Sequence, residues 1–336
     1  MKKIIIIALL IAFMTPFLSG VSLAILTTVA DGYYYYLEEC IFCGSACSYE
    51  SGIRTDRGIY VNYTEWVEEI GKVCGTDHDI GIMEFDISSM EGVFTSGQFQ
   101  AELFLKVQYR YRPDEGDICL SFNSITDLEE NGIIEEGDVN TTEHIGEFCG
   151  NFQPDDIIRV DVTSAIEHDL FDPDQSSFSG FVIDRGTDWE LYIEFHSSHT
   201  ANPSYSPKLC IKDTNSSDDL DGDCISDDTD NCLNHFNPFQ EDTYPPQGNG
   251  IGDACECEAD FDCSGSVDAN DVSTFLNDFS RGQYLDPCTN EDPCNGDFSC
   301  DGDLDSFDVT KFLEDFGRNT YSNPCPTCVE GDWCVY

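Results

Sequence analysis

Apolar and polar residues alternate along many short stretches between residues 25 and 212. The longest stretch, residues 101–111, has an apolar side chain at every second position: Ala101, Leu103, Leu105, Val107, Tyr109 and Tyr111. Alternation with a period of two predicts a strand with one buried face, so we expect these six side chains to share that face. Shorter runs of this kind occupy residues 83–87, 158–162, 191–195 and 209–211. The pattern predicts a mainly β domain, a two-sheet sandwich of the jelly-roll type, with a short helix starting near residue 161.

The hydrophobic period changes near the C-terminus. Apolar residues recur there at i, i+3, i+4 and i+7, first as Val272, Phe275, Leu276 and Phe279, then as Val309, Phe312, Leu313 and Phe316. This spacing predicts two amphipathic helices in the same phase.

A loop rich in oxygen-bearing side chains precedes each predicted helix. Residues 260–271 and 297–308 carry such side chains at loop positions 1, 3, 5, 9 and 12, and glycine at position 6. Calcium takes six to eight oxygen ligands, and this is the spacing of an EF-hand calcium loop. With position 7 included, the candidate ligands are Asp260, Asp262, Ser264, Ser266, Asp268 and Asp271, then Asp297, Ser299, Asp301, Asp303, Asp305 and Asp308. Aspartate replaces the usual glutamate at position 12.

A loop followed by a helix, repeated once over residues 258–320, resembles a dockerin module with two F-hand calcium loops. The resemblance implies bound Ca²⁺ and a cohesin-like protein receptor. The end of each loop and the start of its helix select the partner in dockerins, and the two copies differ there. The alternative is that calcium only holds a small module together.

A second acidic segment lies upstream. The residues at 219–232, 237–240 and 250–255 resemble a thrombospondin type 3 repeat, in which the chain wraps around calcium ions and cysteines crosslink it. Carried over position by position, the resemblance implies as ligands Asp219, Asp221, Asp223, Asp228 and Asp230. It also implies Asp242, Asn249 and Asp253 for a second ion. The expected role of this acidic segment is that of a spacer.

The first 24 residues have the pattern of a secretory signal: two lysines, an apolar stretch, and the small-x-small residues Ser22-Leu23-Ala24. An uncleaved membrane anchor is the alternative. No later segment is apolar enough to cross a membrane, so we expect no membrane insertion after cleavage and an extracellular location. The predicted division is then 25–212 for the sandwich, a linker at 214–217 within the calcium repeat 213–257, the dockerin-like part 258–320 and a cysteine-rich cap 321–336.

Charge limits the possible partners. The chain of 336 residues has 66 acidic and 15 basic residues, a net charge of −51. Binding of nucleic acid or of an anionic membrane requires Lys and Arg, so neither is expected. Residues 213–336 hold 30 acidic and 3 basic residues, and 30 − 3 leaves 27 uncompensated negative charges. Such a segment would repel itself unless cations neutralise it.

The chain has 18 cysteines, which in an exported protein predict disulfides. Cys119 and Cys149 are expected to pair, and the partner of Cys210 is left open. Cys40, Cys43 and Cys47, with Cys74 beyond, have a spacing that also fits a metal or iron–sulfur site. Cys325, Cys328 and Cys334 predict a disulfide-held cap, although an incomplete zinc site has the same spacing.

The predicted sandwich also carries short sequence pieces that resemble the DNRLRE family of secreted, carbohydrate-binding-module-like sandwiches. They occupy residues 30–33, 84–88, 160–163, 195–198 and 206–211. The resemblance implies binding of a glycan or a surface ligand. Rings cover the apolar face of a sugar at small entropic cost. The candidates are Tyr33, Tyr34, Tyr35, Tyr36, Trp66 and Trp189, although for each ring taken singly a place in the core or at a strand edge is the favoured interpretation.

We find no motif of a nucleophile elbow, a zinc protease helix or a phosphate-binding loop, so the sequence predicts a protein that is not an enzyme. The predicted function is that of a secreted calcium-binding modular protein, with a ligand-binding sandwich and a docking module. One alternative is an accessory or catalytic part of an extracellular polysaccharide-degrading complex, since a pair of carboxylates can meet from anywhere in the chain. Another is a structural protein of cell-surface or matrix adhesion.

Overall fold

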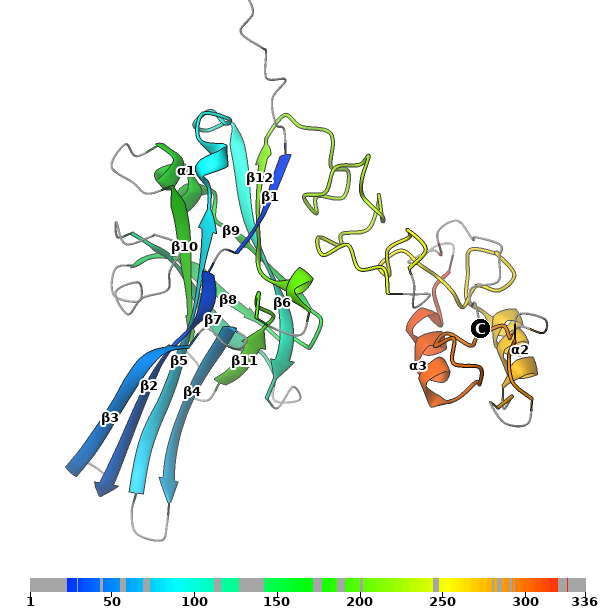
Figure 1. The fold of residues 1–336 in the computed structure, drawn as a ribbon, viewed down its shortest axis with the longest axis horizontal. Coiled ribbons are helices and arrows are strands. Elements are labelled where there is room, and N and C mark those ends of the chain that lie inside the picture. Colours follow the sequence, from blue (N-terminus) through cyan, green and yellow to red (C-terminus); the bar gives the residue numbers. More distant parts are fainter. Residues whose placement is uncertain are drawn as a thin grey trace, which may run out of the picture. The chain divides into compact units, whose positions relative to one another are not determined.

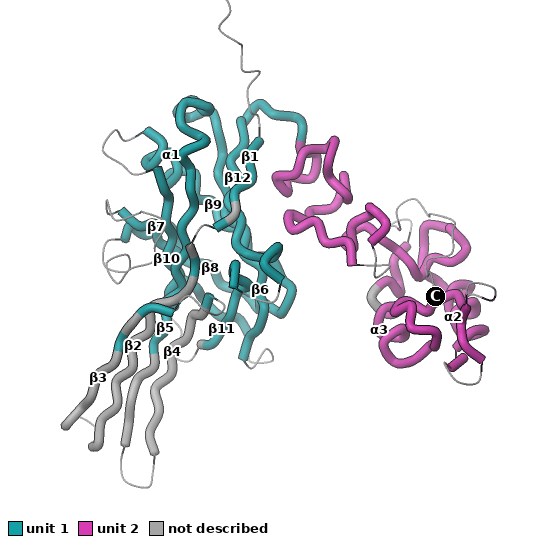
Figure 2. The backbone as a smooth tube through the Cα atoms, viewed as in Figure 1, with its two compact units in different colours: residues 1–218 teal, residues 219–336 magenta. Residues whose placement is uncertain are grey.

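The chain divides into two compact units, residues 1–218 and 219–336, in a computed structural model (Figure 2). It describes residues 23–28, 30–42, 45–54, 59–68, 73–111, 116–126, 142–171, 177–185, 191–199, 202–243, 248–279, 281–282, 286–289, 292, 294–319 and 325. For most of residues 32–77 the backbone alone is described. Residues 1–22 of the predicted signal, Trp189, Cys43, Cys328 and Cys334 lie outside the described residues.

The first unit is mainly β, as predicted (Figure 1). Its strands are β1 (Leu23–Thr27), β2 (Ala30–Phe42), β3 (Ser45–Arg54), β4 (Ile59–Glu68), β5 (Val73–Asp86), β6 (Phe99–Arg110), β7 (Ile118–Ile125), β8 (Thr142–Gly150), β9 (Ile157–Asp161), β10 (Phe178–Arg185), β11 (Leu191–Phe195) and β12 (Lys208–Asp213). Helix α1 (Thr163–Phe171) follows β9, where the sequence predicted a short helix, and short 3-10 turns occupy Ser88–Met90 and Pro203–Tyr205. The first two residues of β1 belong to the predicted signal.

Every described strand pair is antiparallel, and the pairs form two sheets. The order is β1-β12-β6-β11-β4-β5-β10-β7-β8, with β9 beside β6, β2 beside β5, and β3 beside β2. The first part of β6 pairs with β12 and β9, whereas its end pairs with β11. Strand β6 therefore belongs to both sheets.

One apolar core receives side chains from both sheets. It includes Leu103 and Leu105 of β6, Phe85 of β5, Phe181 of β10 and Leu209 of β12, all with no exposed surface. Fully burying a side chain of this size stabilises the fold by about 1.5–3 kcal/mol relative to leaving it exposed. The alternating residues of the predicted strands therefore fill this core, as expected for a two-sheet fold.

The prediction for the end of β6 is wrong. Ala101, Leu103, Leu105 and Val107 are fully buried, but Tyr109 is 46% exposed and Tyr111 is 49% exposed. Phe195 pairs with Val107, while the preceding residue Glu194 pairs with Tyr109, so Gln108 is an extra residue on β6. Such a bulge reverses which face the following side chains take.

The second unit holds the two predicted helices, α2 (Ala269–Asp278) and α3 (Ser306–Asp315). Four phenylalanine rings pack between the helices and the loops that precede them: Phe261, Phe275, Phe298 and Phe312. The closest pair joins the two helices, with the ring centroids of Phe275 and Phe312 4.8 Å apart. No helix of the described residues has the length and apolarity needed to span a bilayer.

Disulfides crosslink both units. Cys119 pairs with Cys149 between β7 and β8, which confirms the predicted bond. In the second unit, the described bonds are Cys232–Cys255, Cys257–Cys325 and Cys288–Cys294. Cys210, Cys224, Cys263 and Cys300 are also disulfide-bonded. Crosslinks of this kind restrict the unfolded chain, which matters most where apolar residues are few.

Candidate metal centre

The first loop of the second unit gathers carboxylates around its own backbone amides. Oδ1 of Asp260 accepts a hydrogen bond from the amide of Ser264 at 2.9 Å, and Oδ2 accepts from Gly265 at 2.8 Å. One oxygen each from Asp260, Asp262 and Asp271 lies within 4.8 Å of the other two. Asp260 and Asp271 are buried and Asp262 is exposed, so a hard cation placed among these oxygens would find several ligands close to the surface of the loop.

The second loop repeats this arrangement around Asp297. Its two carboxylate oxygens accept from the amides of Asp301 at 3.3 Å and Gly302 at 3.0 Å. Asp308 at position 12 is fully buried and accepts from Ser299 at 3.2 Å. Position 1 of both loops thus binds the backbone at position 6, which gives the two loops similar closed shapes.

The aspartate at position 12 of each loop also takes part in capping the helix that follows. Oδ2 of Asp271 accepts from the amide of Asp268 at 2.8 Å, and the Asp268 side chain caps the first turn of α2. Asp308 and Asp305 form the same reciprocal capping box at α3. A capping box satisfies amides that a helix leaves unpaired at its start. Each candidate ligand set is therefore joined directly to the start of a helix.

Two residues of each loop adopt left-handed backbone. At position 6, Gly265 has φ of +81° and Gly302 has φ of +94°, which confirms the need for glycine there. At position 4, Cys263 and Cys300 also have positive φ, +55° and +56°. This second left-handed position was not predictable from the residue type, because cysteine has no preference for left-handed backbone.

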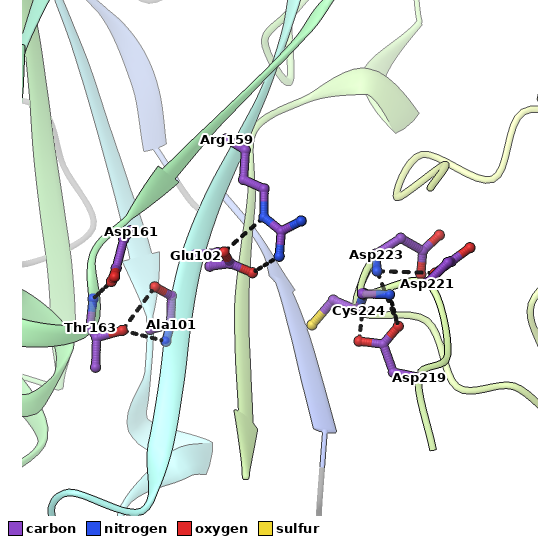
Figure 3. A network of polar contacts seen from close by, with 10 residues as sticks. Ala101, Glu102, Arg159, Asp161, Thr163, Asp219, Asp221, Asp223 and Cys224 are labelled. Atoms are coloured by element: carbon purple, nitrogen blue, oxygen red, sulfur yellow. Dashed lines mark hydrogen bonds and ion pairs between the residues drawn. The ribbon is translucent and has the colours of Figure 1, made fainter. Parts of the chain in front are cut away.

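A third group of carboxylates lies at the start of the second unit, in the segment that resembles a thrombospondin repeat (Figure 3). One oxygen each of Asp219, Asp221 and Asp223 lies within 4.8 Å of the others. Asp219 accepts from the amides of Gly222 at 2.8 Å and Asp223 at 3.0 Å, so this loop also closes on its first aspartate. Asp223 is fully buried.

The other predicted ligands of this segment lie apart from that group. Asp230 is connected to it through Gln240, whose amide donates to Asp230 Oδ1 at 2.9 Å and to Asp223 Oδ2 at 3.4 Å. Asp228 is exposed. Its neighbour Asp227 accepts from the amide of Leu220 at 2.8 Å and closes the loop instead. Numbering the loop from Asp219 places Asp227 at position 9, the signal that would have identified it.

The candidates for a further ion do not meet in this way. Asp242 accepts from the amides of Asn249 at 3.0 Å and Gly250 at 2.9 Å. Asp253 instead accepts from the amide and hydroxyl of Thr243, at 2.7 and 2.6 Å. The two carboxylates are therefore used in separate backbone turns.

Burial makes these carboxylates difficult to ionise together. It raises the pKa of Asp308 to about 6 and that of Asp223 to about 6, and it raises the pKa of Asp271 and Asp221 in the same direction. Neighbouring aspartates add to the rise by like-charge repulsion. The donor set, several carboxylate oxygens and no thiolate or imidazole, fits a hard divalent cation such as Ca²⁺.

The arginines of the unit are engaged elsewhere. Arg281 forms ion pairs with Asp292 at 2.9 Å and Asp278 at 3.5 Å, and it also donates to the carbonyl of Pro287. Arg318 pairs with Asp315 at 2.9 Å. These contacts fix the chain after each helix.

The predicted aromatic and cysteine sites of the first unit lie largely beyond what the structure describes. Tyr33 to Tyr36 lie on β2 and Trp66 on β4, with their side chains undescribed. In strand register, Cys40 of β2 stands opposite both Cys47 of β3 and Cys74 of β5. The sheet thus places three of the four cysteines in one row. This register is compatible with disulfides and also with a metal or iron–sulfur site.

Neither the models of known protein families nor the curated protein sequences match this chain. Function must therefore be inferred from the chain's own residues.

Proposed function

We propose that this chain is a secreted, non-enzymatic, modular calcium-binding protein. The carboxylate groups of the second unit would bind Ca²⁺, and the first unit, folded as a jelly-roll sandwich, would bind a glycan or surface ligand. One observation carries the proposal: one carboxylate oxygen each from Asp260, Asp262 and Asp271 lies within 4.8 Å of the other two.

Calcium would act by joining loops and helices. The position-12 aspartates Asp271 and Asp308 would bind the ion with one part of the carboxylate and cap α2 and α3 with the other. Binding energy at such a site is folding energy, because the unfolded chain has no preformed site. The ligands we propose for the three loops are Asp260, Asp262, Ser264, Ser266, Asp268 and Asp271, then Asp297, Ser299, Asp301, Asp303, Asp305 and Asp308, then Asp219, Asp221, Asp223, Asp227 and Asp230.

Calorimetry on the full oxidised chain tests this proposal. Calcium should bind with measurable heat, raise the helical signal and raise the melting temperature, and a chelator should reverse all three effects. Magnesium at equal concentration is the control, because it requires a smaller octahedral site and gives up its water reluctantly. Absence of heat and of any change in melting temperature with millimolar calcium would overturn the assignment.

A docking role for the helices rests on their outer surfaces. Leu276 is 58% exposed on α2, and Leu313, 37 residues later on α3, is 59% exposed. Phe279 and Phe316, which end the two helices, are also exposed, at 42% and 51%. Exposed apolar side chains repeated on two helices are typical of a protein-binding surface. We therefore propose that the module is dockerin-like and that its partner is a cohesin-like protein.

A pull-down from the secreted proteins of the producing organism tests the docking role, with and without calcium. The expected result is a partner retained only with calcium and lost when Leu276 and Leu313 are both replaced by Ser. If capture is equal with chelator present, the calcium-dependent docking proposal is wrong. If the captured partner also bound other proteins that act on glycans, this result would support assembly into an extracellular polysaccharide-degrading complex.

A further inference from the structure

We infer that Tyr109, Tyr111 and Tyr192 form a platform that binds a neutral polysaccharide on the outer face of the first unit. The inference rests on the glycan-binding role proposed above and names the surface and ligand class for it. None of these tyrosines was a candidate from the sequence, because alternation alone placed Tyr109 and Tyr111 in the core.

The bulge on β6 creates this surface. Gln108 is the extra residue, so Tyr109 and Tyr111 face outward while Arg110 between them is only 3% exposed. Bulges of this kind often re-aim side chains near functional sites. Without the bulge, two large rings would enter the core and an arginine would face solvent, which is the arrangement that burial alone favours for these residue types.

The neighbouring strand supplies the third ring. Tyr192 of β11 directly precedes Ile193, and because Ile193 and Phe195 fill the core, Tyr192 takes the opposite face of the strand. The ring centroids of Tyr109 and Tyr192 lie 5.8 Å apart in an edge-to-face contact, with an angle of 73° between the ring planes. The amide of Tyr111 donates to the carbonyl of Tyr192 at 3.0 Å. Strands β6 and β11 run side by side here (Figure 1).

Buried contacts beneath the rings hold the platform in place. The Arg110 guanidinium donates to Asn151 Oδ1 at 2.6 Å, to the carbonyl of Phe152 at 3.1 Å and to the carbonyl of Gly116. The side chain between the two tyrosines is thereby fixed to two separate loops. A rigid aromatic surface loses little conformational freedom on binding, which favours affinity.

The chemistry of this surface selects a neutral sugar polymer. The rings are tyrosines, which combine an apolar face with a polar edge and suit a ligand that is itself part apolar and part hydroxyl. Glu194 follows Tyr192 by two residues on β11 and pairs with Tyr109 in register, so its carboxylate lies on the same face as the rings. Because the chain has a net charge of −51, an acidic polysaccharide would be repelled.

Binding of the intact, calcium-loaded chain to polysaccharides tests the inference. The probes are insoluble cellulose, xylan, mannan and chitin as neutral polymers, and alginate as an acidic one. We expect wild type to bind at least one neutral polymer and not alginate. Tyr109→Ala and Tyr192→Ala should each weaken binding by about tenfold, the usual effect of truncating an anchoring ring. Tyr109→Phe should retain most of the affinity, because the ring remains.

Phe171→Ala is the matched control, since Phe171 is an aromatic residue 42% exposed on α1, away from β11. It should bind like wild type, and unchanged thermal unfolding of the tyrosine variants would show that they fold.

If wild type binds a neutral polymer and both alanine variants bind equally well, the platform is wrong and the glycan role stands. If wild type binds none of the five polymers, the glycan role itself fails. Preference for alginate would overturn the ligand class.

Discussion

The backbone amide of Val267 donates a hydrogen bond to the carbonyl of Arg318 at 3.0 Å. Val267 is position 8 of the first loop, whereas Arg318 follows the helix of the second repeat. The reciprocal bond also exists, because the amide of Leu304, position 8 of the second loop, donates to the carbonyl of Arg281 at 3.0 Å. Each loop is thus attached to the chain that leaves the other repeat's helix, so neither repeat can be completed alone.

This reciprocal pairing predicts that damage to one loop spreads to the other. Asp260→Ala removes the acceptor for two loop amides and a candidate calcium ligand, so it should expose the amide of Leu304 in the second loop to faster hydrogen exchange. Exchange measured with calcium present checks this. Asp228→Ala, at an acidic residue exposed to solvent outside these two loops, is the control. Unchanged protection of Leu304 in Asp260→Ala would show that the repeats fold independently.

Two adjacent aspartates in the first acidic segment should differ in their effect. Asp227→Asn weakens the acceptor that closes the loop onto Leu220, whereas Asp228→Asn alters an exposed side chain. We expect calcium affinity to fall by about tenfold or more for the first substitution and to change little for the second. Calorimetric titration of both variants with calcium measures the difference. An equal loss of calcium affinity in the two variants would favour the ligand set predicted from the sequence, which contains Asp228.

Calcium affinity should rise with pH. Burial raises the pKa of Asp308 from 3.8 to about 6, so without calcium this carboxyl holds its proton more tightly when folded. Its contribution to stability is then complete below pH about 4 and is lost as the pH rises through about 6. Calcium competes with that proton, so binding should strengthen between about pH 5 and 7. Titrations at stepped pH check this, and Asp308→Asn should flatten the profile. A constant affinity across that range in wild type would contradict the prediction.

Asp31 should be a main determinant of the stability of the first unit. It is fully buried and accepts hydrogen bonds from Thr28 Oγ1 at 2.9 Å and from the amide of Ser198 at 2.8 Å. Asp31→Ala leaves these donors without their acceptor, so it should lower the free energy of unfolding by about 3 kcal/mol. Urea unfolding measures the change. Asp117→Asn, at an exposed position, should shift it by less than about 0.5 kcal/mol. A similarly small change for Asp31→Ala would show that the network does not stabilise the fold.

The elements that the sequence predicted well are those set by neighbouring residues. Helices α2 and α3 lie where the spacing of Phe275 and Phe312 placed them, and glycines take left-handed backbone at position 6 of both loops. Local spacing is sufficient here because a loop of twelve residues carries its own turn and its own carboxylates. The strand around Leu103 also followed its pattern, because alternation determines which face is buried.

Such local patterns did not predict contacts between residues that are distant in sequence. The bond between Cys257 and Cys325 spans 68 residues, and nothing in the spacing of eighteen cysteines identified it. The sequence pattern around Asp31 and Ser198 likewise did not predict that the Asp31 carboxylate accepts a hydrogen bond from the Ser198 amide, 167 residues away. Contacts of this kind depend on how strands assemble, and one sequence does not report that.

The mainly β first part, the two helices near the C-terminus and the acidic loops that precede them are already encoded in the chain's local periodicity, since each depends on a few neighbouring residues. The outward orientation of Tyr109 and Tyr111 and the pairing of each loop with the far repeat became visible in the folded chain alone. Both features have one cause, because a bulge and a hydrogen bond between repeats form against a partner strand or loop that is distant in sequence.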